Sequence, residues 1–280
     1  MSTQQGRSAR HRKLAAELVK LRERAGLTRE HAAAALGWQR SKLSRIETSV
    51  TMPSVADVTQ ILGVYGGTDQ ATRLAFIDLT RQIRERGWWV PYGEVFPGSY
   101  AELEDAANRI LTLQKEIVPG LLQTADYARE LIARHIGDAR EADLRLQARM
   151  TRQAILLRDK PPALRVVLAE EVLRRPIGGD AAMRRQLEKL LVEGERPNIE
   201  IRVIPTAAAD YPTFGEGSMV IFEFDSPIDL DTVYVEYVPG GHYIEEIEQV
   251  RRCTVAYSGA AAAALSPEES ADLISAIAKK

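Results

Sequence analysis

The sequence contains one cysteine, Cys253, and no apolar run close to the roughly 20 residues that a membrane-spanning helix needs. A single cysteine cannot form an internal disulfide, and it excludes a multi-cysteine zinc site. The N-terminal segment MSTQQGRSARHRK lacks the apolar core of a signal peptide. We therefore expect a cytoplasmic protein that does not associate with a membrane.

Motifs for catalysis and for cofactor binding are also missing. There is no Walker-type phosphate loop, no dinucleotide fingerprint and no Gly-x-Ser-x-Gly elbow. His242 and Glu245 have the i, i+3 spacing that two metal ligands can use, but no third ligand accompanies them. We therefore expect no enzymatic activity, no cofactor and no bound metal.

Charge is distributed unevenly along the 280 residues, a length that suggests about two domains. Residues 1–50 contain 11 Lys and Arg against 4 Asp and Glu, a balance of +7. The remainder contains 26 against 35, a balance of −9, so the net charge is −2. A basic end on an acidic body is typical of a nucleic-acid-binding domain joined to a second domain with another role. A chance distribution is the alternative.

Apolar residues at helical spacing predict an all-α domain over residues 1–86. In the last of its helices we expect Leu74, Ile77 and Ile83 to face inward. The five expected helices cover residues 10–25, 28–36, 38–47, 54–65 and 68–86.

The segment LTREHAAAALGWQRSKLSRIET, residues 27–48, contains two short helices that meet at Gly37. This is the geometry of the DNA-binding helix-turn-helix, whose second helix enters the major groove. Such a helix needs polar side chains on its outer face, and Leu43 and Ile46 supply the apolar side behind them. A protein-interaction module with a solvated polar face is the alternative. We expect base contacts from Gln39, Arg40, Ser41 and Lys42, and phosphate contacts from Arg29, Ser44 and Arg45.

Residues 12–65 resemble the XRE (phage-repressor-like) helix-turn-helix family. The family pattern Leu-Thr-Gln-Glu-x-Leu-Ala-x-x-Leu-Gly-x-Ser-x-Ser-x-Ile-Ser-x-x-Glu, then Pro-Ser and a helix ending in Tyr-Gly, reads here LTREHAAAALGWQRSKLSRIET…MPSVADVTQILGVYG. The resemblance implies a sequence-specific transcriptional regulator that binds double-stranded DNA and is nucleoid-associated when bound. Arg29 replaces the usual Gln, Ala32 the usual Leu and Gln39 the usual Ser. Glu47 is expected to be structural and to brace the helix end or an inner arginine, because DNA would repel an outward carboxylate.

We expect a connector at residues 87–100, GWWVPYGEVFPGSY, and a mixed α+β domain at 101–280, so the whole fold is α/β. The connector is expected to be docked and to be the only covalent path between the domains. Pairing on two half-sites favours a homodimer. The connector aromatics Trp88, Trp89, Tyr92 and Phe96, with helix 68–86, are the candidate dimer surfaces. The expected helices are 100–113, 124–134, 138–158, 180–194, 243–264 and one from 266, and the four expected strands are 163–170, 198–205, 217–224 and 232–238.

The second domain also resembles a known group. The segments GWW, LEDAANRI, VPGLLQTADYAR, RMTRQAIL, EEVLRRPIGG, MRRQLEKLL, IRVIP, GSMVIFEF and TVYVEY occur in this order in actinomycete regulators, among them the WhiJ-like developmental regulators. Their C-terminal domain has no assigned chemistry. The resemblance implies a developmental regulator whose gene lies beside that of a small acidic protein, which is a candidate partner.

Four residues of the second domain are candidates for a partner or ligand site. Arg149, Arg152 and Gln153 share a helix face, where they hold an anion or an acidic partner, or pair with acids inside the domain. Glu236 lies in an apolar strand beside Tyr234, where it suits acid–base chemistry or pairs with an arginine. We expect a domain that binds a partner protein or ligand and thereby modulates DNA binding. A catalytic domain centred on Glu236 and a small-molecule sensor are the alternatives.

Overall fold

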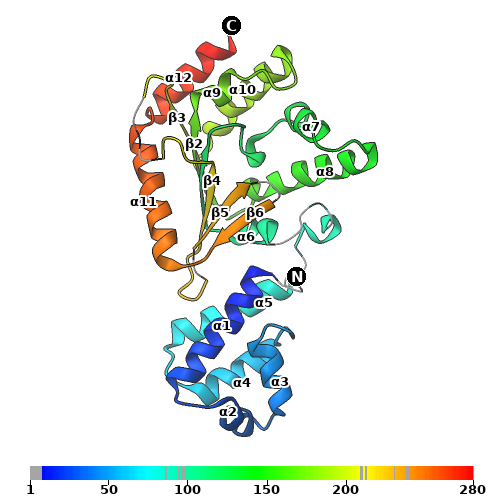
Figure 1. Cartoon of the computed structure of the whole chain (residues 1–280), viewed down its shortest axis with the longest axis vertical. Coiled ribbons are helices and arrows are strands. Elements are labelled where there is room, and N and C mark those ends of the chain that lie inside the picture. The colour runs from blue at the N-terminus through cyan, green and yellow to red at the C-terminus, as the bar shows by residue number, and fades with distance from the viewer. Residues whose placement is uncertain are drawn as a thin grey trace. The chain divides into compact units, whose positions relative to one another are not determined.

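The computed structural model describes residues 8–85, 87–93, 95, 99–208, 211, 213–229, 231–237 and 240–279. The chain forms two compact units (Figure 1). The first comprises Met1–Leu103 and Asp225–Leu230, and the second comprises Glu104–Phe224 and Asp231–Lys280. The chain therefore passes between the units at three points, so the connector is not the only covalent path. The boundary also differs from the one expected at residue 86, because the first unit includes the connector.

The first unit is helical, as its sequence predicts. Each of four helices begins at a side-chain cap: the Ser8, Thr28, Ser54 and Asp69 side chains each accept a backbone N–H from the first turn of the following helix. Within the connector, Trp88 and Trp89 stack edge to face, and Phe96 lies outside the described residues. The helices are α1 (Ala9–Arg24), α2 (Arg29–Leu36), α3 (Arg40–Glu47), α4 (Val55–Tyr65), α5 (Gln70–Arg84) and the short 3-10 helix η1 (Val90–Tyr92).

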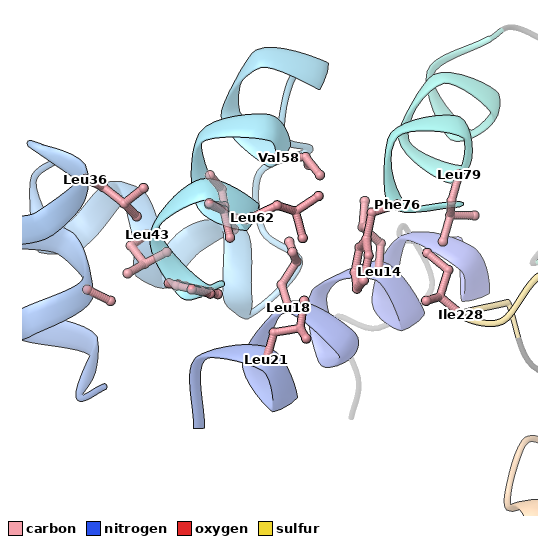
Figure 2. Close-up of a cluster of buried hydrophobic side chains, with 14 of the residues drawn as sticks. Leu14, Leu18, Leu21, Leu36, Leu43, Val58, Leu62, Phe76, Leu79 and Ile228 are labelled. Atoms are coloured by element: carbon pink, nitrogen blue, oxygen red, sulfur yellow. The ribbon is translucent and has the colours of Figure 1, made fainter. Parts of the chain in front are cut away.

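A single apolar core joins these helices. Figure 2 shows Leu14 of α1 against Phe76 of α5, and Leu18 near Leu62 of α4. The expectation that Leu74 faces inward was wrong, because this side chain is half exposed. The inner line of α5 runs through Phe76 and Leu79, and Leu74 falls on the other side of the helix.

The second unit is built around one six-stranded sheet with the strand order β3-β2-β1-β4-β5-β6. Strands β1, β2 and β3 are parallel, whereas β4, β5 and β6 each run antiparallel to the preceding strand in this order. The strands are β1 (Arg109–Gln114), β2 (Ala163–Ala169), β3 (Ile199–Ile204), β4 (Met219–Glu223), β5 (Thr232–Tyr237) and β6 (Gly240–Ile244). In Figure 1, α11 lies on one side of this sheet and α7 and α8 lie on the other.

The remaining elements follow the sheet in sequence. Helix α11 packs on the sheet through Val250, Tyr257 and Ala260. None of the helices in the described ranges has both the length and the apolar content needed to cross a membrane. The helices are α6 (Tyr100–Ala106), η2 (Gly120–Leu122), α7 (Ala125–Ala133), α8 (Ala139–Arg152), η3 (Gln153–Leu157), α9 (Glu170–Arg174), α10 (Asp180–Gly194), α11 (Ile247–Ala263) and α12 (Pro267–Ala278).

The structure has two strands that the sequence interpretation did not predict. The expected helix 100–113 ends at Ala106, and β1 follows it in the centre of the sheet between β2 and β4. Four consecutive residues of β1 are buried, so its sequence has no strand periodicity to recognise. The expected helix 243–264 begins at Ile247, because β6 pairs with β5 just before it.

A buried carboxyl group lies beside α1 in the first unit. Burial raises the pKa of Glu102 to about 7, with a further increase from the charge of Asp229. A hydrogen bond with Ser8 and the charges of Arg10 and Arg12 act in the opposite direction but do not outweigh burial. The folded protein therefore holds the neutral form of Glu102 at a pH where the unfolded chain is ionised.

We predict that the contribution of Glu102 to the stability of the first unit falls as pH rises from about 4.5 to about 7. Protonated Glu102 contributes fully below the unfolded pKa of 4.5, and the contribution is lost as pH rises to about 7. The free energy of unfolding of Glu102→Gln should rise relative to wild type by on the order of 3 kcal/mol between about pH 4.5 and pH 8. Guanidinium unfolding followed by tryptophan fluorescence measures it, because Trp38, Trp88 and Trp89 all lie in this unit.

The matched control is Glu23→Gln, an exposed carboxylate on α1. Its free energy of unfolding over the same pH range is the baseline with which Glu102→Gln is compared. A pH-independent difference between Glu102→Gln and wild type would contradict the prediction.

Candidate nucleic-acid interface

The turn between α2 and α3 is set by Gly37. This residue has a φ of 66°, in the left-handed region that favours glycine, and its N–H caps the carbonyls of Ala33 and Ala34. Trp38 then donates its N–H to the Ala33 carbonyl at 2.9 Å. Ala33 itself is buried, so its small side chain lets the two helices approach closely. Local chemistry thus fixes the angle at which α3 leaves the turn.

A buried carboxylate holds the end of α3 against three other helices. The Glu47 side chain is 0% exposed and accepts from Arg22 Nε at 2.7 Å and from Arg29 Nε at 2.8 Å. The Tyr65 hydroxyl lies 3.4 Å from Glu47 Oε1. Burial, reinforced by the Glu47 charge, raises the pKa of Tyr65, so this phenol remains a hydrogen-bond donor. The expected structural role of Glu47 as a brace for an inner arginine agrees with this geometry.

Arg29 lies at the edge of this buried cluster. Its Nε group is used by Glu47, but its side chain is still 34% exposed. The terminal N–H groups of a guanidinium can bind a second acceptor while Nε keeps the first. Arg29 can therefore present a positively charged group whose position Glu47 fixes.

Lys42 of α3 lies between an aromatic ring and a carboxylate. Its Nζ atom is 2.5 Å from Asp57 Oδ1 and 3.7 Å from the centre of the Trp38 ring. Asp57 also closes the capping box of α4 with Ser54. Burial opposes ionisation of Asp57, but the hydrogen bonds from Lys42 and Ser54 prevail and lower its pKa. Asp57 therefore competes with any DNA acceptor for the Lys42 ammonium group.

Arg40, the first residue of α3, makes a weaker contact of the same kind. Its Nη2 atom lies 2.7 Å from Glu30 Oε1, and both side chains are more than half exposed. The pKa of Glu30 is lowered first by its own backbone N–H and also by Arg40. An exposed pair of this type contributes little to stability and opens readily.

Four of the residues expected to contact DNA have side chains with no hydrogen bond or ion pair to the described part of the chain. Gln39 precedes α3 and does not cap it with its side chain. Ser41 and Arg45 are exposed on α3, while Leu43 and Ile46 are buried behind them. The set of unpartnered side chains is Gln39, Ser41, Ser44 and Arg45.

In the second unit, Arg149 and Gln153 meet around one turn. Arg149 Nη1 donates to Gln123 Oε1 at 2.7 Å, and Gln153 Nε2 donates to the carbonyls of Gly120 and Gln123. Lys189 Nζ donates to Gln153 Oε1 at 2.7 Å, and burial lowers the pKa of Lys189. These side chains brace the segment that contains η2 and leads into α7.

The other two candidates of the second unit lie in different surroundings. Arg152 Nη2 is 2.9 Å from Glu104 Oε1, and both side chains are buried. Gly120 packs on this guanidinium so closely that a Cβ there would lie 2.9 Å from Arg152 Nη2. Glu236 lies on the exposed end of β5, opposite Gly241 of β6. The structure thus groups Arg149, Arg152 and Gln153 around η2 and places Glu236 on the sheet.

Comparison with known families bears on both units. A family model described as a domain of unknown function, DUF5753, matches residues 98–276. The chain belongs to the DUF5753 family. A model described as a helix-turn-helix domain matches residues 13–76, so the first unit contains a DNA-binding fold. A search of curated proteins and a search of solved structures gave no match.

Sequence reasoning missed several residues of the interface of this DUF5753-family protein. Glu30 and Asp57 hold two of the cations expected to contact DNA, and Gln60 accepts from Trp38 Nε1 while donating to the Leu36 carbonyl. The Lys42–Asp57 pair joins residues 15 apart, so helical spacing alone does not reveal it. The capping box of α4 was the available signal for Asp57.

We predict that Glu47→Ala destabilises the first unit by about 3–5 kcal/mol, because it leaves the buried Arg22 guanidinium without its carboxylate. Guanidinium unfolding followed by tryptophan fluorescence measures the loss. The control Glu30→Ala removes an exposed partner of Arg40 and should change stability much less than Glu47→Ala does. Equal effects of the two substitutions would show that the buried cluster does not stabilise the helix-turn-helix.

Proposed function

We propose that this protein is a sequence-specific DNA-binding transcriptional regulator of the XRE class. The main support is that α3 and the residue before it direct Gln39, Ser41, Ser44 and Arg45 outward, without partners in the described part of the chain. A helix that only covered a core would not need this set of hydrogen-bonding groups. The balance of +7 in residues 1–50 supplies the attraction to phosphate that DNA binding requires.

The proposal assigns different tasks to the residues of the interface. Base contacts come from Gln39, Arg40, Ser41 and Lys42, which lie at the N-terminal end of the reading helix. Arg29, Ser44 and Arg45 anchor the phosphates. Of these cations, Arg40 and Lys42 are each paired with a carboxylate of the same unit, and that carboxylate competes with a DNA acceptor. Glu30 and Asp57 therefore weaken binding to any site that does not offer both cations a good acceptor.

We predict that two arginine variants separate these tasks. Arg40→Ala should cost about 1–3 kcal/mol on the preferred site and relax its specificity. Arg45→Ala should weaken binding to all sequences alike and reduce the slope of log K against log salt by about 0.9. Titration of fluorescent duplexes at several salt concentrations measures both, using a site selected from a genomic fragment library.

The matched control is Arg251→Ala, an exposed arginine of α11 that pairs with Glu248 outside the helix-turn-helix. It should leave both the affinity and the salt slope unchanged. Absence of salt-dependent binding by the wild-type protein to any fragment of the library would overturn the proposed function.

We infer that the second unit acts by binding an effector and not by catalysis. Arg149, Arg152 and Gln153 are engaged inside the domain, so a partner must meet other surfaces or compete for these groups. Glu236, the candidate acid or base, is exposed and lies opposite a glycine. A Glu236→Gln variant that retains DNA binding and partner capture but loses regulation would favour the catalytic alternative.

The resemblance to WhiJ-like developmental regulators of actinomycetes suggests the effector, a small acidic protein. The short reach of one reading helix favours a homodimer on two half-sites about one helical turn apart. Bound to DNA, such a dimer would be associated with the nucleoid.

We predict that native mass spectrometry of the tagged protein, purified from its native host, detects a dimer carrying a stoichiometric small protein. Measurements over a range of concentrations, with and without DNA, separate dimerisation from partner binding. A monomer mass under all these conditions would contradict the homodimer. Purification of the protein without any small protein would remove the support for that effector.

A further inference from the structure

A short segment between β4 and β5 belongs to the first unit, although the strands on both sides of it belong to the second. This segment, Asp225–Leu230, is six residues long. At its base, the Phe224 N–H donates to Asp231 Oδ1 at 3.1 Å, which ties the two strand ends together. Pro227 restricts the backbone between them. Only four residues, 224–227, separate the end of β4 from Ile228.

The apolar anchor of this segment is Ile228. Its side chain is 5% exposed and forms part of the core of the first unit. Figure 2 shows it beside Leu14 of α1 and Leu79 of α5. Ile228 thus completes a core whose other buried members come from the first 79 residues of the chain.

The polar anchor is Asp229, which is 4% exposed. Arg10 of α1 binds it with Nε at 2.8 Å and Nη2 at 2.6 Å, and the same Nη2 atom donates to Gln82 Oε1 at 2.6 Å. A carboxylate buried to this degree is held strongly in place, because withdrawal leaves an uncompensated charge on each side. The segment is therefore fastened to both α1 and α5.

Helix α1 carries a second buried guanidinium near its other end. Arg22 binds Glu47, the last residue of the reading helix α3. One rigid helix thus connects Asp229, through Arg10, with Glu47, through Arg22. A displacement of α1 therefore also moves Arg22 relative to Glu47 at the end of α3.

We propose that the segment 225–229 is a strap that couples the β4–β5 hairpin to the DNA-binding unit. A change in the sheet that shifts β4 against β5 pulls Ile228 and Asp229 and alters the packing of α1 and α5. The consequence for regulation rests on the proposed function, but the mechanical coupling does not. The connector at residues 87–100 is then a second path and not the only one.

Hydrogen exchange measured by mass spectrometry on the full chain tests the strap without any effector. Val233→Ala in β5 removes two fully buried methyl groups and loosens the sheet, and Ile221→Val in β4 is a milder change of the same kind. In the wild-type background we expect each to accelerate exchange about three- to tenfold in β4 and β5, and measurably in α1 and α5.

Two variants of the strap then test separately its apolar contact with the first unit and its length. Ile228→Ala removes the apolar anchor, and insertion of Gly-Gly after Asp225 keeps both anchors but lengthens the segment. In either background, Val233→Ala should still accelerate exchange in the sheet but no longer in α1 and α5. The matched control is the same insertion after Gly137, which joins α7 to α8 and where an added Cβ would meet no atom within 4 Å. With this control insertion, Val233→Ala should still accelerate exchange in α1 and α5.

Two results would overturn the strap. One is that Val233→Ala and Ile221→Val leave exchange in α1 and α5 unchanged in the wild-type background. The other is that Val233→Ala still accelerates exchange in α1 and α5 when the segment is lengthened or carries Ile228→Ala. DNA titration of the same variants distinguishes this failure from failure of the proposed function, because a protein that never binds DNA can still show the coupled exchange.

Discussion

The buried carboxylate of Glu47 is the interaction on which the arrangement of the DNA-binding unit depends. It joins the end of α3 to α1 through Arg22, to α2 through Arg29 and to α4 through Tyr65. A buried charge needs several good partners at fixed distances, so it tolerates few relative positions of the four helices. Apolar contacts would keep the same helices together but would allow them to slide. The direction of the outer face of α3 therefore follows from one hydrogen-bonded cluster.

The outer face itself is partly neutralised before DNA arrives. Glu30 and Asp57 hold Arg40 and Lys42, whereas Arg45 has no partner among the residues that the structure describes. A free cation attracts any phosphate, whereas a cation already paired with a carboxylate gains less from a poorly placed acceptor than from a well-placed one. Under the proposed function, such an arrangement lowers the affinity for DNA in general and increases the difference in affinity between sites. On this view the acidic residues of the interface contribute to specificity.

The sequence was sufficient where structure is decided locally. Gly37 between two short amphipathic segments, with Leu43 behind the polar face, predicted the helix-turn-helix and its outer surface, and also the bracing role of Glu47. The sequence was insufficient where a residue or strand contacts residues far away along the chain. The strand β1 is buried on both faces and has no periodicity, and its place between β2 and β4 depends on residues more than 50 positions away. The pair of Arg10 and Asp229 spans 219 positions, so no local pattern indicates it.

Helix α1 shows why such remote pairs matter for function. A core of Leu14 and Leu18 would be enough to bury it, yet it also carries a buried arginine near each end. Apolar packing is nearly indifferent to which segment supplies the surface, whereas a buried guanidinium selects one carboxylate in one geometry. One of these carboxylates ends the reading helix and the other lies between two strands of the sheet. The two ion pairs therefore make α1 the element through which the distant parts of the chain can influence how α3 is held.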